Sequence, residues 1–447
     1  MHAWLGDYGG AAQGGADDFI SPTCPYTLVS VLEAMEQEIA RKLLPVERVV
    51  MLRLVSKTMR TATESVRPPA MIMVRSRERM ERVEKGILGM IASCKITIIN
   101  ASNIRIGNEG MARLAVVLGR CPSLANLHLA GCGIRDAGAE TLAAVLGQCS
   151  SLAHLDLGRN EVKIKRAARL AAMIGKHPSL ANLHPLCNRI GDAGAERLAA
   201  VLGLCPSLAH LNLGSNRIGD VGAERLAAVL GQCPSLASLH LGWNSIGAKG
   251  AGRLAAMLGQ CPSLAHLDLS GNCIKDEGAG RLAAVLRHCP SLAHLHLGHN
   301  RIKVDGVGRL AQALGQCPSL AHLNLGGNVI GDEGVGRLAA VLGQCPSLAH
   351  LNLGSNGIED EGAERLVAVL SQCPSLSHLD LSWNSIGEQG AGRLAETLRQ
   401  CTSLDHLDLG DNEIEAGRLA AMLGYCQRQH TSLQIISSGL SGKDSTE

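Results

Sequence analysis

Aromatic residues are scarce in this chain of 447 residues, which has three tryptophans, three tyrosines and one phenylalanine. Since 46% of the residues are nevertheless apolar, a core must be built from Leu, Ala, Val and Ile. No apolar run reaches the ~18 residues of a membrane span, and the net charge of +2 gives no general attraction to nucleic acid. We therefore expect neither a membrane nor a nucleic acid as partner.

The motifs of common catalytic and cofactor sites are also missing. The sequence has no His-Glu-x-x-His, Gly-x-Ser-x-Gly, Cys-x-x-Cys or phosphate-loop pattern. The run from Gly250 to Ala255 fits the loose dinucleotide-binding pattern, but it does not directly follow a strand and it recurs at Gly278, Gly306, Gly334 and Gly390. We therefore interpret it as a repeat loop, and we predict no enzymatic activity, no cofactor and no metal ion.

Signs of secretion are absent as well, although the chain has sixteen cysteines. Residues 1–15 have no cationic flank and no apolar run of signal-peptide length. Because disulfides persist mainly in oxidising compartments, we expect free thiols and a cytoplasmic or nuclear location.

The sequence does contain a 28-residue repeat, in which one cysteine recurs ten times. The repeated cysteines are Cys121, Cys149, Cys205, Cys233, Cys261, Cys289, Cys317, Cys345, Cys373 and Cys401, and His177 fills the gap between the second and third. A fixed period of this length indicates a stack of similar units.

Each unit has two halves with different apolar periods. Leu211 and Leu213 alternate with polar residues, which predicts a strand with one buried face. Residues 223–230 have apolar side chains at helical spacing. We expect Gly231 to end this helix. We expect an aspartate to cap the start of its own helix, at Asp192, Asp220, Asp276, Asp332 and Asp360.

A single unit cannot fold alone, because ordering it costs roughly 30 to 50 kcal/mol of backbone entropy while its buried aliphatic side chains contribute about 12. Stacking supplies the missing burial and lets the strands form a parallel ladder. Helices are wider than strands, so the stack must curve. The predicted fold is an α/β solenoid, a curved horseshoe with parallel strands on the concave face, helices on the convex face and a small helical segment at the N-terminus.

The pattern Leu-x-x-Leu-x-Leu-x-x-Asn-x-Ile, followed by Gly-Ala-x-x-Leu-Ala-x-x-Leu, resembles the ribonuclease-inhibitor class of leucine-rich repeats over about residues 94–426. The resemblance implies that the repeated cysteine is buried and that the repeated asparagine satisfies backbone groups between neighbouring loops. The asparagines are Asn160, Asn188, Asn216, Asn244, Asn272, Asn300, Asn328, Asn356, Asn384 and Asn412.

Two units depart from this pattern. In one, Lys163, Lys165 and Arg166 replace the usual Gly and Asp, and in the next, Pro185 replaces a core leucine. Because proline cannot donate to a sheet ladder, we expect a bulge or a change of curvature near Pro185.

The ends of the chain differ from the repeats, which we place at residues 91–434. We expect residues 1–24 to be disordered, residues 25–90 to be helical and residues 435–447 to be a flexible tail. The run from Leu43 to Arg60 resembles the later part of an F-box, with Met59 in place of the usual tryptophan. This resemblance implies docking of a Skp-type adaptor of a cullin ubiquitin ligase. A plain helical cap over the first repeat is the alternative.

Candidate binding residues lie at the two outward strand positions, which hold most of the seventeen histidines. One position carries His210, His266, His294, His322, His350, His378 and His406, and the other carries Asp268, His296, Asp380 and Asp408. Three interpretations of these rows are open: recent duplication of one unit, a surface for a partner, and zinc capture by adjacent rings. Zinc capture lacks a dedicated tetrahedral set of ligands. Because imidazole titrates near pH 6.5, we expect this face to become cationic on mild acidification.

Trp243 and Trp383 are the only aromatic residues between residues 27 and 424, and both directly precede a repeated asparagine. That place lies at the rim of the predicted sheet. An exposed anchor for a partner and packing within the loop are the two interpretations, and tryptophan is enriched at binding hot spots.

These features predict a monomeric, non-enzymatic scaffold that binds a protein partner on its concave face. The finer hypothesis is the substrate receptor of a cullin-type ubiquitin ligase. The repeats are also similar to those of Ran GTPase-activating proteins and NOD-like receptors, so the alternatives are an activator that acts on a small GTPase and a sensing module.

Overall fold

From β3 to β14 the described residues alternate between one strand and one helix, and the described strands of the chain form a single 15-stranded sheet in sequence order. The first pair of strands, β1 and β2, is antiparallel, and the following pairs are parallel. In this computed structural model the described residues are 96–162, 168–397, 401 and 403–415, with the backbone alone of 51–52, 70–73 and 434–436.

The strands are short and regularly spaced. They are β1 (Met51–Leu52), β2 (Ala70–Met73), β3 (Ile96–Asn100), β4 (Asn126–His128), β5 (His154–Asp156), β6 (Asn182–His184), β7 (His210–Asn212), β8 (Ser238–His240), β9 (His266–Asp268), β10 (His294–His296), β11 (His322–Asn324), β12 (His350–Asn352), β13 (His378–Asp380), β14 (His406–Asp408) and β15 (Gln434–Ile436).

The helices occupy the second half of each unit. They are α6 (Gly107–Leu118), α7 (Asp136–Leu146), α8 (Ala168–Ile174), α9 (Gly191–Leu202), α10 (Asp220–Leu230), α11 (Ala248–Leu258), α12 (Lys275–Leu286), α13 (Val304–Leu314), α14 (Gly331–Leu342), α15 (Asp360–Leu370) and α16 (Glu388–Thr397). In the described part of the chain, no helix is long and apolar enough to cross a membrane.

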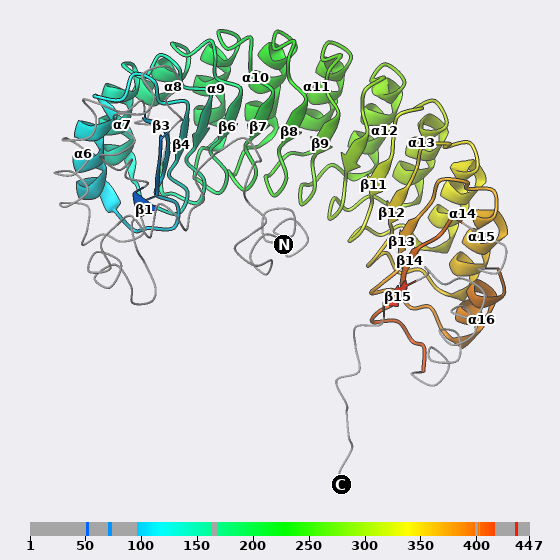
Figure 1. Cartoon of the computed structure of the whole chain (residues 1–447). Helices are drawn as coiled ribbons and strands as arrows, with labels where there is room; N and C mark the ends of the chain where they lie inside the picture. The colour runs from blue at the N-terminus through cyan, green and yellow to red at the C-terminus, as the bar shows by residue number, and fades with distance from the viewer. Residues whose placement is uncertain are drawn as a thin grey trace, which may run out of the picture.

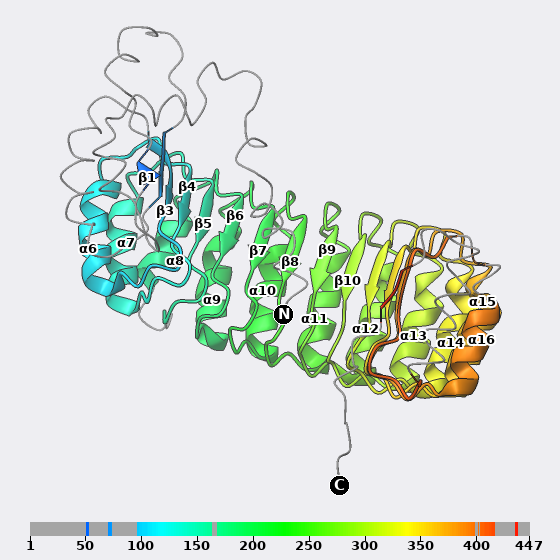
Figure 2. The ribbon, with the colours of Figure 1, turned by 60° about the horizontal axis from the view of Figure 1, so that its bottom comes forward.

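The units stack into an arc, with the strands on its inner side and the helices on its outer side (Figure 1). Neighbouring strands are about 4.8 Å apart, whereas a helix with its side chains is about 10 Å wide, so the outer side must be longer. A second view shows the strands side by side along the inner face (Figure 2). The predicted curved solenoid is confirmed.

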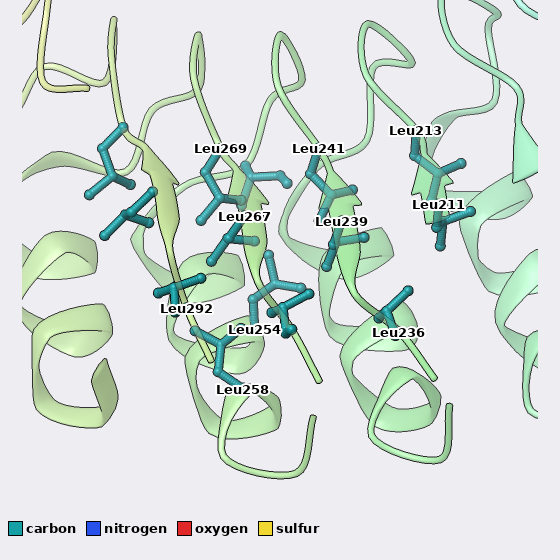
Figure 3. Packing of buried hydrophobic residues seen from close by; sticks show 14 of the residues in the cluster. Leu211, Leu213, Leu236, Leu239, Leu241, Leu254, Leu258, Leu267, Leu269 and Leu292 are labelled. Atoms are coloured by element: carbon teal, nitrogen blue, oxygen red, sulfur yellow. The ribbon is translucent and has the colours of Figure 1, made fainter. Parts of the chain in front are cut away.

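The core is a continuous row of leucines between the sheet and the helices. Leu239 of β8 and Leu267 of β9 point toward the helix layer, where Leu254 and Leu258 of α11 lie (Figure 3). The cysteines of the 28-residue grid line the same core and are buried, as is His177 in the place of one of them. The buried cysteine that the resemblance implied is therefore present.

The repeated asparagines connect neighbouring units through their side chains. The amide Nδ2 of Asn300 donates to the carbonyl oxygen of Leu269 in the preceding unit (2.9 Å) and to that of Leu297 in its own unit (3.0 Å). Its Oδ1 accepts from the backbone N–H of Ile274 at 3.4 Å. Each asparagine thus satisfies buried backbone groups that the turn leaves without partners, as the resemblance implied.

The repeated aspartates cap the next helix rather than their own, so that part of the prediction was wrong. Oδ1 of Asp220 accepts from the backbone N–H groups of Gly247 and Gly250, both at 2.7 Å, at the start of α11. Gly250 lies inside this helix and not in a loop, and a Cβ there would lie 2.7 Å from the same oxygen. Gly231 does end α10, but with right-handed helical geometry (φ −61°). The capping contact therefore also joins adjacent units.

Pro185 shortens one step of the sheet, and the bulge, one of the two alternatives that we predicted there, is absent. β5 and β6 pair at three positions, whereas β6 and β7 pair at two with the register unchanged. Proline has no N–H to donate, so only one hydrogen bond is lost. The carbonyl oxygen of Pro185 still accepts from Asn188 and Asn216, which keeps the units in line.

Three strands extend the sheet at its two ends. Our helical prediction for residues 25–90 is wrong at β1 and β2, because the open edge of β3 offers unpaired backbone groups on which strands can form. At the other end β15 includes residues 435–436, which we predicted to begin a flexible tail. The remaining predictions for residues 1–95 and those for Lys163, Lys165 and Arg166 fall outside the described residues, and of the F-box-like run only Met51–Leu52 is described.

Candidate functional site

The concave face presents two rows of side chains from the strands β4 to β14. The middle residue of each strand is a buried leucine, so the first and third residues point to the opposite, inner side. We call the first residues the first row and the third residues the second row. All the predicted binding residues except the two tryptophans lie in these rows.

Six successive histidines of the first row stack face to face. Parallel pairing places their Cα atoms in register, and neighbouring ring centroids are 3.8 to 4.1 Å apart with interplanar angles of 8 to 19°. We call this set the histidine stack; it consists of His266, His294, His322, His350, His378 and His406. The predicted ladder is present, and its rings are half-buried by one another.

His210 belongs to the same row but stands outside the stack. Its neighbours in the row are Asn182 and Ser238, so its ring is flanked by short polar side chains and is exposed. The hydroxyl of Ser238 lies 2.8 Å from Nε2 of His240 in the second row. Sequence reasoning missed Ser238, although it is the one residue that separates His210 from the run of histidines.

The pKa values in the stack contradict the predicted response to mild acid. Burial, followed by repulsion from neighbouring imidazoles, lowers the pKa of His294, His322 and His350 to about 4. The same causes lower the pKa of His266 and of His378. Stacked rings lose water, and each charge opposes the next. The centre of the stack is therefore neutral at pH 5.5, and the prediction of a cationic face was wrong there.

The aspartates of the second row also have a structural role. Oδ1 of Asp268, Asp380 and Asp408 accepts the backbone N–H two residues later, at 2.8 to 2.9 Å, and this turn ends each strand. Burial raises the pKa of Asp408, and the nearby carboxylates of Asp380 and Asp411 raise it further. These carboxylates therefore serve the fold even where they face the inner surface.

His240 and His296 flank Asp268 in the second row. Nδ1 of His240 lies 3.8 Å from Oδ2 of Asp268. Burial raises the pKa of Asp268, but hydrogen bonds from His240 and Ser270 outweigh that effect and hold the pKa below its ordinary value. Burial lowers the pKa of His296, although Asp268 opposes this change. A carboxylate between two imidazoles is thus the main charge in this part of the face.

Trp243 and Trp383 lie at the rim of the sheet and are 62% and 65% exposed. Both have φ 57°, a left-handed conformation that favours glycine, and glycine occupies the same place at Gly271. The Trp243 ring covers Gly271 and lies 5.5 Å from the ring of His299. Sequence reasoning missed His299, which the period alone could have found, because it follows Trp243 by two repeats.

The described residues of the concave face form a surface with hydrogen-bonding and stacking groups. Among all the described residues no three or more His, Cys, Asp or Glu side chains, the stacked histidines included, are arranged around a single point where they could hold one metal ion. Their cysteines are free thiols. What the face offers chemically is stacked neutral imidazoles, interspersed carboxylates and two exposed indoles.

Known proteins share this architecture. The leucine-rich-repeat family model matches nine segments, at residues 120–143, 204–227, 232–255, 260–283, 288–311, 316–339, 344–367, 372–395 and 400–417. A search of curated protein sequences finds no significant match.

Two solved structures illustrate the likeness. A chain from the yeast Rad7–Elc1 complex is 18% identical, with a TM-score of 0.51, 81% of this chain covered and 87% of the other. An internalin from Listeria monocytogenes is 20% identical, with a TM-score of 0.48 and coverages of 84% and 99%. The nine matched segments and the parallel sheet that they build establish that the chain is a leucine-rich-repeat protein.

Proposed function

We propose that this leucine-rich-repeat protein is a non-enzymatic scaffold whose concave face binds a protein partner. The observation that carries the proposal is the exposure of Trp243 and Trp383, 62% and 65%, at the rim of an uninterrupted inner surface. Each indole leaves most of its surface without a packing gain, although its left-handed conformation costs the backbone roughly 1 kcal/mol. Contact with a partner would supply that gain.

The arrangement of the inner rows supports the same proposal. The histidine stack and the second row present half-exposed polar edges along successive repeats, and the tryptophans stand five repeats apart on one rim. A partner that lies along this face would contact an apolar anchor at each end and hydrogen-bonding groups between them. Interfaces commonly combine a few aromatic anchors with a polar surround.

Quantitative affinity purification with the full chain as bait tests this proposal. The bait carries Trp243→Ala and Trp383→Ala, and the matched control carries Leu204→Ala and Val221→Ala, whose side chains are 59% and 58% exposed at the helical side of the units. We expect the tryptophan variant to lose its main partner by at least about tenfold, and the control to keep it. Equal recovery of the same partner by both baits would exclude the tryptophans as anchors.

We further propose that the N-terminal segment docks a Skp-type adaptor, so that the solenoid selects substrates for a cullin-type ubiquitin ligase in the cytoplasm or nucleus. The support is the F-box-like run from Leu43 to Arg60. Removal of residues 1–50 takes away the start of that run and leaves β1 and β2 in the chain. We expect the shortened chain to lose the adaptor in a pull-down and to keep the partner of the concave face.

Other results would separate the alternatives. Failure of the full chain to bind the adaptor would contradict the ligase hypothesis and favour a plain cap, whereas equal binding without residues 1–50 would exclude that segment as the docking site. Acceleration of GTP hydrolysis by a small GTPase in the presence of the full chain would instead favour the GTPase activator.

A further inference from the structure

The histidine stack brings six metal-ligating rings into one continuous row. Neighbouring ring centroids are 3.8 to 4.1 Å apart and the rings are nearly parallel. Two imidazole nitrogens that bind one ion at about 2.0 to 2.1 Å lie roughly 3 Å apart. Nearly parallel rings direct their nitrogen lone pairs side by side, so two adjacent rings must rotate out of the stack until both lone pairs point at one ion. The rings are half-exposed, so they can rotate toward solvent.

In three of the six rings the orientation leaves Nε2 as the nitrogen that can bind an ion. Nδ1 of His350 and Nδ1 of His406 are buried, and Nδ1 of His378 lies 2.8 Å from the hydroxyl of Ser377. The nitrogen on the solvent side of these rings is therefore Nε2. A hydroxyl that holds Nδ1 is the kind of supporting contact that fixes the tautomer of metal-binding histidines.

We propose that the histidine stack binds borderline divalent cations such as Zn²⁺ or Ni²⁺, each held by the Nε2 atoms of two adjacent rings and completed by water. Six rings provide up to three separate pairs. Imidazole suits these cations, and two protein ligands leave coordination positions open. The proposal is independent of the protein partner, although an open position could accept a ligand from one.

Protons and thiols compete weakly for such ions here. At pH 7 an imidazole with its ordinary pKa near 6.5 is already mostly neutral. Burial raises the pKa of Cys205 and Cys261 to about 11, so these core thiols remain protonated. Metal ions bind the deprotonated forms of both groups, which favours the stack over the buried cysteine grid.

Two triple variants of the full chain test whether adjacency matters. The alternate variant carries His294→Asn, His350→Asn and His406→Asn, and leaves three rings with no adjacent pair. The contiguous variant carries His266→Asn, His294→Asn and His322→Asn, and leaves three neighbouring rings. Both variants retain three rings of the stack, and asparagine already occupies this row at Asn126 and Asn182.

Isothermal titration calorimetry with Zn²⁺ alone and with Ni²⁺ alone, at pH 7.5 in a thiol-free reductant, gives the readout. We expect the contiguous variant to keep the wild-type affinity with fewer ions bound, and the alternate variant to bind about 100-fold more weakly because it loses the second linked ligand. Equal affinities in the two variants, or wild-type binding no tighter than that of the alternate variant, would overturn the proposal.

A gain-of-site variant keeps the test decisive if the triple variants fold poorly. Ser238→His inserts a ring between His210 and His266 and lengthens the stack at its N-terminal end. We expect more ions to bind per chain at unchanged affinity. An unchanged number of bound ions would contradict the proposal.

Discussion

The two halves of the solenoid differ in the chemistry of their inner surface. In β4 to β8 the first row alternates between Asn126, His154, Asn182, His210 and Ser238, whereas in β9 to β14 it is histidine throughout. Ring contacts follow this difference, since parallel stacking begins at His266 and continues to His406. The proposed metal pairs lie in the second half only.

The framework beneath these surfaces is the same in both halves. Nδ2 of Asn188 donates to the carbonyl oxygens of Leu157 and Pro185 at 3.0 and 3.1 Å, which repeats the pattern that Asn300 makes in the other half. The comparison shows that the buried positions fix the fold while the outward positions are free to vary. The proposed function therefore rests on the outward positions.

Removal of a repeated asparagine is expected to lower the free energy of unfolding more than any other change that we propose. The loss should be the same in the two halves of the solenoid. Asn300→Ala leaves several buried carbonyl and N–H groups without a partner, and we expect a loss of at least about 3 kcal/mol in the free energy of unfolding. Asn188→Ala should cost the same within about 1 kcal/mol. Urea denaturation followed by circular dichroism measures both. A much smaller cost for Asn188→Ala would show that the two halves are held together differently.

The shared framework is also the part of the molecule that the sequence predicts well. The 28-residue period, the alternation around Leu211 and the repeated asparagine specify strand, helix and stacking direction, because each recurs in every unit. The aspartate cap was assigned to the wrong helix, since Asp220 contacts Gly247 and Gly250 across a unit boundary. A pattern along the chain does not show which of two neighbouring units accepts a contact.

The inner surface was predicted in position but not in chemistry. The period places six histidines in one row, yet their low pKa values arise from distances between rings that no sequence pattern states. The proximity of Trp243 and His299 likewise depends on the glycine between them, Gly271, over which the indole lies. Such properties belong to the assembled stack and not to any single unit.

Acid is expected to destabilise the histidine half more than the other half. The pKa of His294, His322 and His350 falls from 6.5 to about 4 on folding, so the unfolded chain binds more protons between these values. Stability is therefore complete above pH 6.5 and falls as the pH drops toward 4. Because the rings are half-exposed and screened by solvent, we expect only about 1 kcal/mol for each ring.

Thermal unfolding of the wild type and of a variant with His294→Asn, His322→Asn and His350→Asn at pH 7.5 and at pH 4.5 measures this effect. The variant should lose less stability on acidification than the wild type does. An identical loss in the two chains would assign the acid sensitivity to carboxylates whose pKa is lowered in the folded chain, such as Asp268, instead of the histidine stack.

The smallest expected effect concerns the first half, where Pro185 shortens the pairing of β6 with β7. We call this pairing the irregular step. Pro185→Leu restores an N–H that can donate to the carbonyl oxygen of Asn212, as Leu213 donates to that of His240 at 2.8 Å. A hydrogen bond contributes about 1 kcal/mol, from which the lost stiffness of proline in the unfolded chain subtracts roughly half. We therefore expect a gain of about 0.5 kcal/mol in the free energy of unfolding.

A matched exchange shows whether that gain comes from the ladder. Pro206 is exposed in the loop before β7, so Pro206→Leu removes a proline without restoring a sheet hydrogen bond and should give no gain. If Pro185→Leu instead destabilises the chain as Pro206→Leu does, the surroundings have adapted to proline. Leu186, the next residue, would carry this adaptation. Its Cδ1 packs closely against Gly214 of the following unit, 2.8 Å from the position that a Cβ on Gly214 would take. The irregular step would then be a packed feature of the first half, not a defect in it.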